Sequence, residues 1–120
     1  MSKILAALLL GASTPSAAAQ DSESFDLRCL ILTAQLRQSE DATVRQAGEG
    51  ASYFFFGRVD ARVPESELED RMWQESQAML HEDLQAILQA CGNLMQERGR
   101  MLIDVGNRIQ ARERAGPPRR

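Results

Sequence analysis

Apolar residues recur along most of the chain at alternating spacings of three and four residues, which predicts amphipathic helices. In the first such stretch, Phe25, Cys29, Leu32 and Leu36 share one helix face. We expect this helix to end near Gln38, where polar residues that favour a helix cap follow. The pattern predicts a well-buried first helix.

The longest pattern lies in the last third of the chain. Its apolar face repeats every seven residues and is interrupted by a single arginine: Leu84, Leu88, Cys91, Met95, Arg98, Leu102, Val105 and Ile109. A helix of about 27 residues spans about 40 Å. We therefore expect a long helix that forms the backbone of a bundle and whose last turns overhang it.

Two further helices are predicted between these, over about 41–62 and about 64–80. Pro64 separates them, because Val63 before the proline is pushed out of helical angles. Small residues gather in the earlier of the two: Gly48, Gly50, Ala51 and Ser52. This patch predicts either a bend or break in the helix, or the close approach of another helix such as the one that bears Cys29.

The N-terminal residues have the three parts of a secretory signal peptide. Lys3 supplies the positive charge, residues 4–12 are apolar, and Ala17 to Ala19 offer a cleavage site before Gln20. Nine apolar residues are too few to cross a bilayer as a helix. We therefore predict a signal peptide over 1–19 and a periplasmic or secreted protein without a membrane span.

Composition changes once this segment is set apart. Lys3 is the only lysine, so the remaining chain carries 13 arginines against 17 acidic residues. This acidic balance argues against nucleic acid as a partner. In an oxidising compartment, the two cysteines Cys29 and Cys91 most simply form one disulfide, and each lies on the apolar face of its helix. The disulfide is therefore expected to join the first and last helices.

Together these patterns predict an all-α protein, a small four-helix bundle (three to five helices) with a long C-terminal helix. The expected organisation is a flexible N-terminus over 20–24, a single helical domain over 25–110 and a disordered tail over 111–120. Its length and composition suit one domain and no more.

Candidate chemistry is confined to arginines. Arg58 and Arg62 lie four residues apart on one helix face and repel each other unless an anion lies between them. A carboxylate of Glu67, Glu69 or Asp70 is one candidate for that anion, and a bound ligand is the other. Arg98 either reaches off the apolar face to a carboxylate or water, or forms an anion site beside the core. No catalytic residue, metal site or cofactor site is expected.

Three segments resemble small exported proteins of sphingomonad-type alphaproteobacteria. They are Arg28-Cys29-Leu30, Ala90-Cys91-Gly92, and the run Tyr-Phe-x-x-Gly-Arg-x-Asp-x-Arg-x-Pro over 53–64. The resemblance implies export and a shared architecture, and it implies no activity. It makes Tyr53, Gly57, Arg58, Asp60 and Arg62 the first residues to consider as a binding or structural motif.

We therefore expect a non-enzymatic periplasmic protein that binds another protein or serves in stress protection. A weaker likeness to periplasmic acid-stress chaperones frames this hypothesis, although the cysteine spacing differs. The hypothesis is favoured by the absence of a catalytic constellation and by the surplus apolar surface expected at Phe54, Phe55, Met72, Trp73 and Met79. The alternative is a protein that binds a small anion through the arginines. The long helix could also pair with a second copy.

Overall fold

The computed structural model describes residues 17–117, with side chains from Ser22 onward. This part of the chain is all helical, as predicted, and contains four α-helices and one short 3-10 helix. Their bounds are α1 Ala17–Leu36, α2 Ala42–Asp60, α3 Glu65–Ala78, η1 Met79–His81 and α4 Leu84–Ala115. The predicted signal peptide over 1–19 lies almost wholly outside the described residues.

Helices α2 and α4 begin where a side chain satisfies free backbone N–H groups of the first turn. Asp41 precedes α2 and accepts hydrogen bonds from the backbone N–H groups of Thr43, at 2.8 Å, and Val44, at 3.3 Å. Asp83 precedes α4 and accepts one from the backbone N–H of Ala86 at 3.2 Å. Acidic caps therefore set the starts of both helices.

Two predicted boundaries are wrong, and both helices concerned are longer than expected. The predicted flexible segment 20–24 belongs to α1, because its side chains have partners on α3: Arg71 donates to Glu23, and the Ser24 hydroxyl donates to Glu75 at 2.7 Å. The predicted tail from 111 is helical as far as Ala115. Strong helix formers continue α4, and Gly116, with φ of 76°, ends it.

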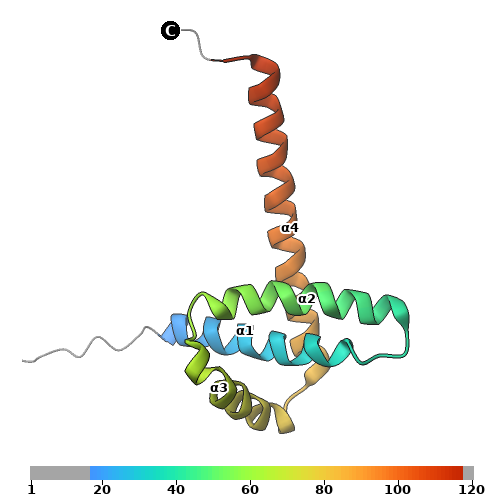
Figure 1. The fold of residues 1–120 in the computed structure, drawn as a ribbon, viewed down its shortest axis with the longest axis vertical. Helices are drawn as coiled ribbons and strands as arrows, with labels where there is room; N and C mark the ends of the chain where they lie inside the picture. The colour runs from blue at the N-terminus through green and yellow to red at the C-terminus, as the bar shows by residue number, and fades with distance from the viewer. Residues whose placement is uncertain (1–16, 118–120) are drawn as a thin grey trace, which may run out of the picture.

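Helices α1 and α2 lie side by side and antiparallel, α3 lies along the other side of α1, and α4 crosses the pair (Figure 1). The buried residues of the main core cluster come from α1, α2, the turn after α2 and α4: Leu27, Cys29, Leu30, Phe55, Val59, Val63 and Cys91. The predicted disulfide is confirmed, since Cys29 and Cys91 are bonded and their Cα atoms are 5.7 Å apart. It ties α4 to α1 within the core.

Gly48 lies where α2 passes close to the last turn of α1. A Cβ at residue 48 would lie 2.5 Å from the Cβ of Leu36 and 3.0 Å from the carbonyl oxygen of Thr33. Helix α2 continues through this point without a break. Of the two readings of the small-residue patch, close approach of the helix that bears Cys29 is therefore confirmed.

The second half of α4 projects from the body, as Figure 1 shows. Met95 is the last α4 side chain that packs against the core cluster. Residues 96–115, here called the overhang, extend for about 30 Å beyond it. The expectation that the last turns overhang the bundle is confirmed.

Candidate functional site

Arg58 and Arg62 converge on one buried carboxylate, that of Asp26 on α1. The Nε of Arg58 donates to Oδ1 of Asp26 at 2.9 Å, and Nη2 of Arg62 donates to its Oδ2. Asp26 is fully buried, whereas each arginine side chain is about a third exposed, at 32% and 35%. The carboxylate thus separates two like charges, and it is held by two guanidinium groups.

The anion between the arginines was therefore predicted, but its source was not. The acidic residues proposed for this place, Glu67, Glu69 and Asp70, form none of the ion pairs between described residues. A signal for Asp26 exists in the sequence, because an acidic residue inside the apolar stretch of α1 needs a cationic partner once it is buried. Its partners are 32 and 36 residues away, so only the packing of α1 on α2 identifies them.

The other residues of the predicted motif do not join this cluster. Tyr53 is 59% exposed, donates a hydrogen bond to Glu49 and lies under the guanidinium of Arg37. Gly57 is exposed, with open space where a Cβ would be. Asp60, the last residue of α2, is also exposed. The motif is therefore distributed over several faces of α2 instead of forming one site.

A second polar cluster surrounds Arg28 of α1. Its Nε donates to Glu75 at 3.0 Å, and its Nη1 donates to Glu82. The hydrogen bond with Glu75 and the negative charge of Glu82 raise the pKa of Arg28, against the opposing effect of burial. These contacts tie α1 to α3 and to the turn before α4.

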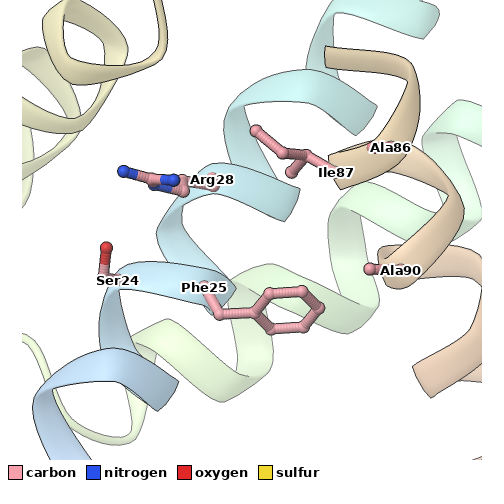
Figure 2. Close-up of a pocket in the computed structure, with 6 residues that line it drawn as sticks. All are labelled: Ser24, Phe25, Arg28, Ala86, Ile87 and Ala90. Carbon is pink, nitrogen blue, oxygen red and sulfur yellow. The ribbon is translucent and has the colours of Figure 1, made fainter. Parts of the chain in front are cut away.

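A surface hollow of about 470 Å³ lies beside Arg28, between α1 and α4. Figure 2 shows Ser24, Phe25 and Arg28 on one side of it and Ala86, Ile87 and Ala90 on the other. The hydroxyl of Ser24 and the guanidinium of Arg28 are both engaged with Glu75. The polar groups of this hollow are thus used to hold the fold together.

The predicted apolar surface is largely in other places. Of the five side chains expected to supply it, Phe55 and Met79 are buried, Phe54 and Met72 are half-buried, and Trp73 is exposed. Burial of these side chains follows from their contacts with the core clusters. Other exposed apolar side chains occur in η1, at the start of α4 and along the overhang: Leu80, Leu84, Met101, Leu102, Ile103 and Ile109.

Arg98 lies on the overhang and is exposed. It belongs to the part of α4 that has left the core, so it forms no anion site beside the core. Leu102, Val105 and Ile109 continue the same face of the helix, and Leu102 is 69% exposed. The apolar stripe of α4 is thus packed in its first half and open to solvent in its second.

Within residues 17–117, no three His, Cys, Asp or Glu side chains are grouped in a way that could hold a metal ion. No helix in this range combines the length and apolar character needed to cross a membrane.

No family model matches the chain, and no curated protein or solved structure shows significant similarity to it.

Proposed function

We propose that the chain is a non-enzymatic, exported protein-binding module and that the overhang of α4 is its binding element. The observation that carries this proposal is the exposed apolar stripe on the overhang, none of whose residues packs against a described core cluster. Leu102 and Ile109 on this stripe are 69% and 52% exposed. Burying such side chains in a partner is favourable by roughly 1.5–3 kcal/mol each.

The arrangement separates a stable body from a presented helix. The Cys29–Cys91 disulfide lies one helical turn before Met95, the last side chain that packs against the core. The overhang therefore starts from an anchored point and needs little ordering when it binds. A preformed element of this kind binds with a smaller entropic cost than a flexible segment.

Export is part of the proposal and has two supports. The first is the signal-peptide pattern over residues 1–19, and the second is the disulfide, which persists in oxidising compartments. Binding of a small anion by Arg58 and Arg62 is the less favoured alternative. Asp26 already occupies the position between them in which an anion would bind.

The proposal is tested by capture from a periplasmic extract with the full chain as bait. The test variant carries Leu102→Glu and Ile109→Glu on the stripe. The matched control carries Asn107→Glu and Gln110→Glu, which add the same charge to the overhang at positions outside the stripe. We expect the wild type and the control to retain the same partner and the stripe variant to lose it. Equal capture by all three chains would contradict the proposal.

A further inference from the structure

The overhang carries positive charge as well as apolar side chains. The overhang, residues 96–115, has five arginines and three acidic residues, whereas residues 20–95 have six arginines and 14 acidic residues. Charge is therefore strongly segregated, with an acidic body and a basic overhang. Arg98 and Arg112 lie on the apolar stripe itself, so a surface that covers the stripe must supply anionic groups next to apolar ones.

The body has a groove with this character. Three hollows of about 330, 280 and 230 Å³ follow one another between α1, α3, η1 and the start of α4. The first two share Ile31 and Ser76, and the second and third share Leu32, Gln35 and Leu84, so they form one continuous groove. Its largest exposed apolar side chains are Trp73 and Leu80, at 67% and 68%.

One end of this groove is acidic. Glu69 and Asp70 line the first hollow together with Trp73. Both carboxylates are exposed, and neither takes part in the ion pairs formed between described residues. Their α3 neighbours Glu65 and Glu67 add to the negative charge of the same helix. The groove thus combines apolar side chains with carboxylates that form no ion pair within the described part of the chain.

We propose that the overhang of one copy docks in this groove of a second copy. The inference rests on the proposed function and names the partner of the overhang. A chain cannot fill its own groove, because α4 is continuous and leaves the body on the side away from its start, where Leu84 lines the groove (Figure 1). The stripe of one copy therefore meets the groove of another, and its arginines meet the acidic end.

Pairing of two overhangs with each other is disfavoured by the same charges. Each overhang would bring Arg98 and Arg112 into a shared apolar seam and would face a second basic helix. Docking in the groove instead places unlike charges together. Two copies that exchange overhangs form a closed dimer, and one-way exchange extends into a longer assembly.

The test is the oligomeric state of the full chain, measured by sedimentation velocity over a range of protein and salt concentrations. Two monomeric variants are expected. The overhang variant carries Leu102→Glu and Ile109→Glu, with Asn107→Glu and Gln110→Glu as its control. The groove variant carries Trp73→Arg and Leu80→Arg, with Gln74→Arg and Ala78→Arg as its control. We expect the wild type and both controls to associate, and increasing salt to weaken this association.

Mixing the two monomeric variants separates groove docking from other contacts. The overhang variant keeps an intact groove, and the groove variant keeps an intact overhang. Their mixture should therefore form a one-to-one complex, although neither variant associates alone. Circular dichroism checks that each variant is folded. If the glutamate variant of the overhang is unfolded, a variant with Leu102→Gln and Ile109→Gln replaces it.

Several results would overturn the inference. They are a monomeric wild type at every concentration, a groove variant that associates like the wild type, or a mixture that stays monomeric. Binding to phosphatidylglycerol vesicles without self-association would also overturn it and would assign the overhang to a lipid surface. If the wild type is monomeric but the overhang variant loses a protein that the wild type captures, the proposed function stands. Only a second copy is then excluded as the partner of the overhang.

Discussion

The Nε of Arg58 donates a hydrogen bond to Oδ1 of Asp26 at 2.9 Å and thereby links α2 to α1 across 32 residues of sequence. The two partners lie in different environments, because the Asp26 side chain is fully buried and the Arg58 side chain is about a third exposed. Removing the carboxylate therefore has different consequences from removing either arginine. Without the carboxylate, the two arginine side chains face each other as like charges. Without one arginine, the carboxylate still has the other arginine as its partner.

We expect Asp26→Asn to lower the free energy of unfolding by about 2 kcal/mol, since charge-assisted hydrogen bonds of this kind contribute on that scale. Arg58→Ala should cost less than Asp26→Asn, because Arg62 still holds the carboxylate. Urea unfolding followed by circular dichroism measures both. Asp60→Asn, at an exposed position on α2, is the control and should change little. Equal stability of Asp26→Asn and Asp60→Asn would show that the buried pair has no net effect.

Two glycines of α2 should respond to alanine with opposite signs. Gly48→Ala places a methyl group 2.5 Å from the Cβ of Leu36, so the helices must separate, and overpacking of this kind costs about 1–3 kcal/mol. Gly50→Ala meets no atom within 4 Å and should stabilise the helix by up to about 1 kcal/mol. Thermal melting of the two variants gives the comparison. A stabilised Gly48→Ala would mean that α1 and α2 are farther apart than described.

Reduction of the disulfide should lower the melting temperature strongly. Cys29 and Cys91 are separated by 62 residues, for which the loop-entropy relation gives about 4 kcal/mol. For a domain of this size, such a loss corresponds to more than about 10 °C. Differential scanning calorimetry with and without a reductant measures it. The variant Cys29→Ala with Cys91→Ala should melt at one temperature under both conditions, and a wild type equally indifferent to reductant would refute the prediction.

Removal of the overhang should leave the body intact. A chain that ends at Gln96 retains Met95 and every residue of the main core cluster. We expect its free energy of unfolding to match that of the full chain within about 0.5 kcal/mol, because no described residue after Met95 packs against either core cluster. The comparison is made by urea unfolding at concentrations where the full chain is monomeric, since self-association adds stability. A large loss would place part of the overhang in the core.

The sequence by itself determined the elements that depend on local spacing. The apolar repeats identified the helices, and the positions of Cys29 and Cys91 on two such repeats predicted their disulfide. Helix ends were less accurate at residues 20–24 and 111–115. Ser24 is held in α1 by a contact with α3 that local propensity does not reveal. After residue 110, helix formers continue α4 as far as the Gly116-Pro117 break.

Only the tertiary structure decided which distant residues meet. Charge alone predicted an anion between Arg58 and Arg62, and the acidic residues nearest in sequence were the candidates. Only the packing of α1 against α2 brings Asp26 to them. The same packing decided that Phe55 is buried and Tyr53 exposed on one helix. It also decided where the repeat of α4 leaves the core, because a periodic pattern shows which face is apolar and not what covers that face.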